Sequence, residues 1–386
     1  MTASIDLASR RWWVLFASVV SFFAIGATFF VVPPLIPELV ARFGLSHAQV
    51  GLLMGAISFP AVALAIPVGM AIDHWPPRRA GLLGLALMLI GAVAFAVAPS
   101  FWVLFVGRLI FGVGGLVINL LLARLLTEAF AGREVALAMG IFMGTYPASM
   151  ITVYSLQPVF LGLLGWRGEL LLLAGLVALA IPLFMAAVPR TEHVASTEAV
   201  VRPSFRVNRS LVALAVGWML FFGVHVSVLT FGPEWAGDET PALLVVTLVM
   251  WVAMVGSPLV GILIDRSSGP VGWLVAGHVV QATVVAGMAA GILPAAPAML
   301  GMGVAAALLP TAAYALPGLL VEPERVGFAF GFITVFSNIG TIVGPVLAGS
   351  LLDASGSFPV VWTASAIAAA LAIGAAIFVS PSSKRD

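Results

Sequence analysis

The chain has no cysteine among its 386 residues, which excludes disulfides, thiolate catalysis and cysteine-ligated metals. Charge is scarce as well, because only 9% of the residues are Asp, Glu, Lys or Arg, against roughly a quarter in soluble domains. The formal net charge of +1 offers no basic surface to nucleic acid. Hydrophobic residues make up 62% of the chain, and the mean hydropathy is +1.16. Such a composition cannot cover a water-facing surface.

Long apolar runs recur along the whole chain, and a membrane-spanning helix needs about 20 such residues. Helices are predicted rather than strands, because backbone groups in lipid must be satisfied within the segment and no run alternates with period two. The twelve predicted spans cover residues 12–37, 48–72, 79–98, 101–125, 134–164, 168–188, 210–232, 241–264, 271–293, 297–321, 326–352 and 358–380. The predicted fold class is therefore an all-α membrane protein.

The positive residues indicate how these spans are oriented, since Lys and Arg are enriched in cytoplasmic loops. Fourteen of the 17 fall on the side that carries both termini, whereas Arg42 and Arg167 fall on the other side and Arg108 lies within a helix. We therefore predict an inner (plasma) membrane protein with both termini in the cytoplasm. The polar segment 189–209 is predicted to link an N-terminal bundle, 1–188, to a C-terminal bundle, 210–386.

An internal repeat relates these two halves. Asp73 and Asp265 each follow a glycine by four residues, and their offset is 265 − 73 = 192. A second pair of segments, beginning at Leu125 and Leu319, gives offsets of 191 to 194 at matching residues. Each half has an even number of spans, so the copies are parallel, an arrangement typical of carriers with a central site.

These residues resemble the motifs of the major facilitator superfamily over essentially the whole chain. Helix 4 contains the run from Leu104 through Arg108 to Gly114, which is similar to the family's L-x-x-x-R-x-x-x-G-x-G pattern. The stretch 138–147 has a weaker resemblance to the cyanate, nitroimidazole and nitrate-like transporters. The resemblance implies twelve helices in two six-helix repeats. It also implies a conformational latch at the cytoplasmic ends of helices 2 and 8, formed by Gly69, Asp73, Arg78, Arg79, Gly261, Asp265 and Arg266. Solvated loop charges are the alternative for the two aspartates.

Arg108 is the sharpest candidate site, since it lies seven residues into a helix, where a charge needs a partner or water. Gly112, Gly115 and Asn119 continue its face, leaving room for a ligand or for a closely packed helix. No carboxylate is predicted within the core of any span, so an embedded guanidinium favours an anionic or hydrogen-bonding solute. The alternative is a structural arginine bonded to helix-end carbonyls.

Other polar residues form stripes that are expected to face the interior of the bundle. The substrate-binding residues predicted on this basis are Arg108, Asn119, Tyr146, Tyr154, Gln157, His225, Tyr314 and Asn338. His225 lies mid-span and is the first candidate for proton coupling, although a buried neutral histidine is the alternative. Weaker candidates are three carboxylates at the external ends of helices, Glu38, Glu234 and Asp353.

Function is therefore predicted to be secondary active transport of a small solute, an organic or inorganic anion, by alternating access. The predicted partners are that solute and the lipid bilayer, and the protein is expected to be monomeric. No G-x-x-x-x-G-K-[ST] loop is present to suggest ATP drive, and the five histidines show no metal-binding spacing, so no metal or cofactor is predicted. An exporter of amphiphilic drugs is the alternative within transport. A membrane-embedded enzyme or a channel is the alternative outside this class.

Overall fold

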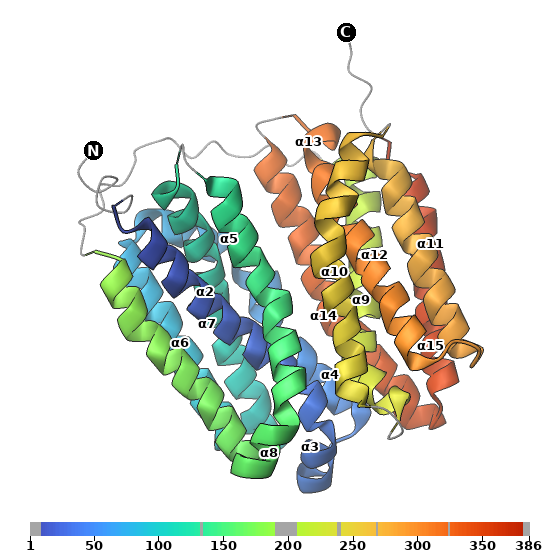
Figure 1. Cartoon of the computed structure of the whole chain (residues 1–386), viewed down its shortest axis with the longest axis horizontal. Helices are drawn as coiled ribbons and strands as arrows, with labels where there is room; N and C mark the ends of the chain where they lie inside the picture. Colours follow the sequence, from blue (N-terminus) through green and yellow to red (C-terminus); the bar gives the residue numbers. More distant parts are fainter. Residues whose placement is uncertain are drawn as a thin grey trace. The chain divides into compact units, whose positions relative to one another are not determined.

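The computed structural model describes residues 9–131, 134–189, 207–237, 241–267, 269–322 and 325–380. These residues form helices joined by short turns (Figure 1). Among them, eleven helical stretches are long and apolar enough to cross a membrane. One of the eleven belongs to α8 (Val135–Ala187), whose 53 residues would extend about 80 Å as one straight helix. Gly165 interrupts α8 with φ 65° and ψ 170°, so α8 supplies two spans and the total is twelve.

The chain divides into two compact units. Unit 1 comprises Met1–Gly44 and Ala56–Ala199, and unit 2 comprises Leu45–Gly55 and Val200–Asp386. The helices of unit 1 are α2 (Arg11–Phe30), η1 (Pro33–Leu35), α3 (Ile36–Phe43), α5 (Phe59–His74), α6 (Pro77–Ala96), α7 (Phe101–Ala129) and α8. The helices of unit 2 are α4 (His47–Ala56), α9 (Arg209–Ala236), α10 (Ala242–Asp265), α11 (Pro270–Ala289), α12 (Ala295–Ala315), α13 (Pro317–Leu320), α14 (Val326–Ser355) and α15 (Phe358–Ile377).

One short segment groups with helices that are far from it in the sequence. Residues 45–55 precede α5 in the sequence, and yet they pack with unit 2. The predicted span 48–72 is therefore two helices, α4 and α5, separated at Ile57 and Ser58. Pro60 accounts for the break, because it has no N–H for the carbonyl of Ala56 four residues earlier.

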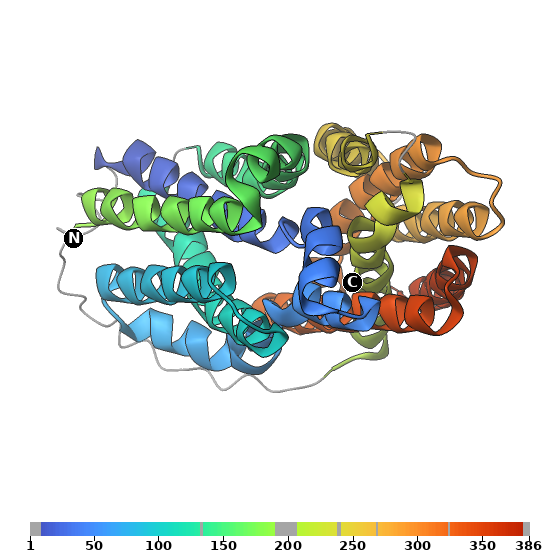
Figure 2. The ribbon, with the colours of Figure 1, turned by 90° about the horizontal axis from the view of Figure 1, so that it is seen from below.

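The same neighbour relations occur within each unit, as the internal repeat predicts. In unit 1, α2 packs on α8, α5 and α6 pack on α7, and α6 packs on α8. In unit 2 the corresponding pairs are α9 with α14, α10 and α11 with α12, and α11 with α15. Figure 2 shows these helices from a second direction. The predicted all-α fold of two six-helix repeats is confirmed.

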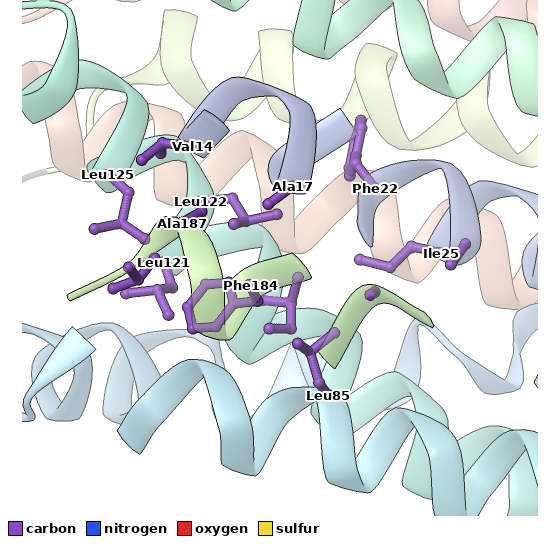
Figure 3. Close-up of a cluster of buried hydrophobic side chains, with 14 of the residues drawn as sticks. Val14, Ala17, Phe22, Ile25, Leu85, Leu121, Leu122, Leu125, Phe184 and Ala187 are labelled. Carbon is purple, nitrogen blue, oxygen red and sulfur yellow. The ribbon is translucent and has the colours of Figure 1, made fainter. Parts of the chain in front are cut away.

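Each unit has its own apolar core. In unit 1, residues from α2, α6, α7 and α8 meet, among them Phe22, Leu85, Leu121 and Phe184 (Figure 3). Glycines bring α6 and α7 together, since a Cβ at Gly91 would meet backbone atoms of Gly107 and Phe111. Small residues at helix contacts let backbones approach closely in lipid. This packing holds the buried Arg108 of α7 at a fixed position.

Candidate functional site

The C-terminal end of α2 is an opened turn that creates buried hydrogen-bond acceptors. Pro33 and Pro34 follow α2 and have no N–H, so the carbonyls of Phe29 and Phe30 cannot bond to the residues four positions ahead. Carbonyls left in a membrane interior need another donor. The proline pair thus explains why buried carbonyl oxygens at the end of α2 are free to accept hydrogen bonds from other side chains.

Arg108 meets this opened turn. Its Nη1 donates to the Thr28 carbonyl at 2.9 Å, and its Nη2 donates to the Phe29 carbonyl at 3.3 Å. The side chain is fully buried, with its guanidinium carbon 5.3 Å from the centre of the Phe95 ring. The negative end of a helix dipole also favours a cation at this place. In the conformation described, Arg108 therefore bonds to helix-end carbonyls, which is the structural role predicted as the alternative to ligand binding.

Unit 1 contains four other residues that were predicted to bind substrate. Tyr146, Tyr154 and Gln157 lie on α8, whereas Asn119 lies on α7. The Tyr146 ring is 4.9 Å from that of Phe30 and lies within electrostatic range of Arg108. Gln157 donates from Nε2 to the Pro34 carbonyl at 3.5 Å, and Tyr154 is fully buried. Asn119 is exposed at its position on α7. The structure thus gathers Arg108, Tyr146 and Gln157 around the break after α2, without Asn119.

The predicted residues of unit 2 include His225 and Tyr314, which belong to a run of ring contacts. His225 stacks on Phe221 at 5.1 Å, Phe221 stacks on Trp218 at 5.2 Å, and Trp218 meets Tyr314 edge-on at 5.5 Å. His225 is 7% exposed, and its Nδ1 has no partner among the described residues. Buried polar atoms are rarely left without a partner.

Asn338 lies elsewhere in unit 2, on α14, and donates to the Thr334 carbonyl of its own helix at 2.9 Å. A bond of this kind, from a side chain to the preceding turn, satisfies the amide locally. Among the described residues, Asn338 has no hydrogen bond to the ring-bearing residues of α9.

Two residues of α11 form a buried polar pair that the sequence analysis did not single out. Gln281 is fully buried and donates from Nε2 to the Phe221 carbonyl at 3.3 Å. His278 is 1% exposed, and neither its Nδ1 nor the Oε1 of Gln281 has a partner among the described residues. Their spacing of three residues on one helix face was the signal available in the sequence.

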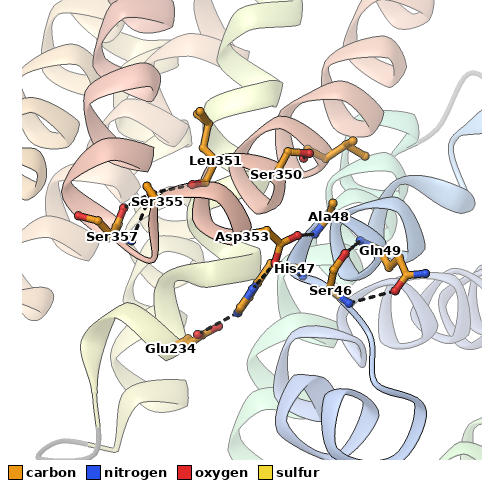
Figure 4. Close-up of polar contacts among 11 residues, drawn as sticks. Ser46, His47, Ala48, Gln49, Glu234, Ser350, Leu351, Asp353, Ser355 and Ser357 are labelled. Carbon is orange, nitrogen blue, oxygen red and sulfur yellow. Dashed lines mark hydrogen bonds and ion pairs between the residues drawn. The ribbon is translucent and has the colours of Figure 1, made fainter.

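The start of α4 is held in unit 2 by a cluster of one imidazole and two carboxylates, which we call the His47 clamp (Figure 4). Asp353, near the end of α14, accepts from the backbone N–H of His47 at 2.8 Å and of Ala48 at 2.9 Å. His47 places Nδ1 2.7 Å from Asp353 Oδ1 and Nε2 3.3 Å from Glu234 Oε1. A carboxylate at a helix N-terminus satisfies free amides and is favoured by the helix dipole.

Ser46 and Gln49 also fix this helix start. The Ser46 backbone N–H donates to Gln49 Oε1 at 3.0 Å, and the Gln49 backbone N–H donates to Ser46 Oγ at 3.2 Å. This reciprocal pair is a capping box, a Ser followed three residues later by Gln before an apolar run. That pattern could have placed the helix start from sequence, whereas the carboxylates that contact His47 lie far away in the chain.

Close backbone packing continues from the His47 clamp along α4 and α14. A Cβ at Gly51 would meet the carbonyl of Pro345, and a Cβ at Gly349 would meet the carbonyl of His47. Further along, a Cβ at Gly55 would lie 2.8 Å from the Cα of Ile342. Three glycines thus allow the α4–α14 contact, which is the reason why residues 45–55 group with unit 2.

The predicted latch residues are only partly described. The side chain of Asp73 lies outside the described part of the structure, while Arg78 donates from Nη1 to the Val188 carbonyl at 3.2 Å. Arg79 is exposed. Arg124 of α7, which was not predicted, donates from Nη1 to the Ile72 carbonyl at 3.0 Å near the end of α5.

The second copy of the latch lies at the end of α10. Asp265 and Arg266 are exposed there, and neither has a hydrogen-bonding or ion-pairing side-chain partner among the described residues. Gly69 and Gly261 have room for a Cβ without a close contact. The latch at both positions stays a prediction.

Comparison with known proteins agrees with this architecture. The family model for the Major Facilitator Superfamily matches residues 14–239 and 234–386. The lysosomal dipeptide transporter MFSD1 of Danio rerio is 25% identical, over 83% of this chain and 76% of its own length. The chloramphenicol efflux pump Rv0191 of Mycobacterium tuberculosis is 27% identical, over 92% of this chain and 90% of its own length.

Among solved structures, the nucleoside transporter NupG has a TM-score of 0.79 at 15% identity, covering 96% of this chain and 99% of that chain. At this identity the likeness concerns the fold alone. The relatives are transporters and not enzymes, which fits the predicted class. The chain belongs to the Major Facilitator Superfamily and is a multi-pass membrane protein of the secondary-transporter kind.

Proposed function

We propose that this protein moves a small anionic solute across the inner (plasma) membrane by alternating access, with both termini in the cytoplasm. The observation that carries the mechanism is the docking of α4 in unit 2. Residues 45–55 are continuous in sequence with α5 of unit 1, and yet α14 holds them through the His47 clamp and three glycines. A contact of this kind must separate when a carrier opens on that side, so we assign it as a gate.

Arg108 supports the proposal that the transported solute is an anion. Its guanidinium places a fixed positive charge inside unit 1, next to Tyr146 and to the opened turn after α2. In alternating access the broken end of a helix is a natural place for a site to rearrange, and guanidinium groups bind carboxylates bidentately. The dipeptide carried by the relative from Danio rerio has such a carboxylate. Tyr146, Tyr154 and Gln157 are proposed to line the same region, with Asn119 toward its exposed end.

A second candidate is export of an amphiphilic drug. The ring contacts from Trp218 through Phe221 to His225 favour it, together with Tyr314, which is half exposed. Aromatic faces bind apolar bodies without demanding one pattern of hydrogen bonds. The chloramphenicol pump of Mycobacterium tuberculosis is a relative whose name supports this class. Asn338 would be a polar contact for such a solute.

Counterflow in proteoliposomes tests the proposed function. Vesicles are loaded with an unlabelled solute, and transient accumulation of the labelled solute from outside is measured for a small carboxylate, a dipeptide, chloramphenicol and a nucleoside. Saturable accumulation of the carboxylate or the dipeptide is expected. Accumulation of chloramphenicol alone would favour drug export, and flux without accumulation would indicate a channel.

Coupling to protons is proposed to involve the His47 clamp as well as His225. Both ring nitrogens of His47 face carboxylate oxygens, of Asp353 and of Glu234. Only the protonated imidazole can donate from both nitrogens, because the neutral ring has one donor and one acceptor. The observed arrangement therefore fits a protonated His47, and loss of that proton would weaken the gate. Glu38, by contrast, pairs with Arg42 at 3.7 Å.

We expect counterflow to respond to external pH through His47. Because only the protonated imidazole can donate to both carboxylates, the gate should hold less tightly at alkaline than at acidic external pH. The variant His47→Gln should lose most of this dependence. Rates are to be compared at external pH of about 5.5 and about 8. Glu38→Gln is the matched control and should respond as the unmodified protein does, whereas an unchanged response in His47→Gln would remove the clamp from coupling.

A further inference from the structure

Glu169 is a buried carboxylate that the proposed function does not use. It lies four residues after the interruption of α8 at Gly165, on the second arm of that helix, and it is only 4% exposed. Its Oε2 has no hydrogen-bond partner, and the side chain forms no ion pair among the described residues. Glu169 falls at the very start of the predicted span 168–188, where the sequence gives no sign of this burial. A buried carboxylate without a partner is costly enough to require a reason.

The two arginines predicted on the same external side as Glu169 are engaged elsewhere. Arg42 pairs with Glu38, and its guanidinium carbon lies 5.3 Å from the centre of the Trp166 ring. Arg167 lies over the same ring at 5.1 Å. Each arginine thus has its contact at Trp166 rather than at Glu169. The carboxylate is therefore available to a positive group from outside the chain.

Glu169 lines a cavity of about 550 Å³ between α2 and the two arms of α8. Phe23 of α2 and Leu156, Phe160 and Leu176 of α8 are among the apolar lining residues. Thr152 is the only other polar side chain in the lining, and its hydroxyl already donates to the Ala148 carbonyl at 2.8 Å. Ligand pockets of proteins have volumes of about 300–1,000 Å³ and are mostly apolar with few polar groups.

From these contacts we infer that the cavity binds a small lipophilic monocation, with its positive charge at Glu169 and its apolar body between α2 and α8. One negative group in an otherwise apolar lining fits one positive charge and leaves no partner for a second polar group. A neutral apolar molecule would leave the carboxylate unpaired, and an anion would be repelled by it. The lining lies wholly in unit 1 and includes neither Arg108 nor its partners Thr28 and Phe29, and the inference goes beyond the proposed transport of an anion.

Binding of tetraphenylphosphonium to the purified protein in lipid nanodiscs tests this inference. Saturable binding of the labelled cation is expected, together with a rise in the unfolding temperature. Tetraphenylborate has the same shape and the opposite charge, so it should show no saturable binding at this site. Glu169→Gln keeps the size of the side chain and removes its charge, and should weaken binding of the cation roughly thirtyfold or more.

Glu38→Gln is the matched control, since it neutralises an exposed carboxylate of the same unit and should leave binding unchanged. Glu169→Gln is expected to fold, because it removes an unpartnered buried charge. Glu169→Asp keeps the charge and should bind more tightly than Glu169→Gln. Equal affinity of the unmodified protein and Glu169→Gln, or saturable binding of tetraphenylborate that Glu169→Gln also changes, would overturn the inference. Because binding is measured without transport, this outcome is independent of the counterflow result.

Discussion

Replacing Arg108 by alanine is expected to lower the free energy of unfolding by roughly 2–6 kcal/mol. The variant removes the donors that serve the carbonyls of Thr28 and Phe29, and each buried carbonyl without a donor costs about 1–3 kcal/mol. The loss of a large buried side chain beside Phe95 adds to this cost. Titration of the protein in mixed micelles with a denaturing detergent measures the difference.

Two further variants separate the structural role of Arg108 from an effect of charge alone. Arg108→Lys keeps the positive charge but replaces the planar fork by one ammonium group, so an intermediate loss is expected. Arg42→Ala removes an exposed arginine from the same unit and should change stability by no more than about 1 kcal/mol. Unchanged stability of Arg108→Ala would show that the opened turn after α2 does not depend on this side chain.

Transport by the same variants tests whether Arg108 also serves the solute. If the guanidinium contributes to binding, Arg108→Lys should retain its fold and still transport an anion poorly, because a bidentate contact cannot be formed by an ammonium group. Full transport by a folded Arg108→Lys protein would limit Arg108 to its structural role.

The number of helices and most of their boundaries follow from sequence because each span is a long apolar run that lipid requires to be helical. The repeat is also visible, since Asp73 and Asp265 mark the same place in each half. The opened turn after α2 was less evident, although Pro33 and Pro34 stand in the sequence. Hydropathy does not change there, and the apolar run therefore concealed the break.

Long-range contacts account for what the sequence could not show. Nothing near residue 47 indicates that Asp353 will meet the amides of His47 and Ala48, because these residues are separated by most of the chain. The burial of Glu169 likewise depends on how the two arms of α8 fold back beside α2. Arg108 was identified from its depth within a helix, while its partners depended on the packing of α7 against α2.

If the α4–α14 contact opens and closes during transport, a reversible disulfide across it should abolish transport. The ideal Cβ of Gly55 lies 3.4 Å from the Cβ of Ile342, close to the 3.5–4.5 Å usual across a disulfide. The natural chain has no cysteine, so the double variant Gly55→Cys with Ile342→Cys has no competing thiols.

Counterflow of the double variant, with the solute that the unmodified protein carries, is to be measured before oxidation, after oxidation and after reduction by dithiothreitol. Each single-cysteine variant, treated in the same way, controls for side effects of the oxidant and of the tight packing at Gly55. We expect transport in the reduced protein, transport at background level once the disulfide has formed, and recovery on reduction. Undiminished counterflow by fully disulfide-linked protein would contradict the assignment of this contact as a gate.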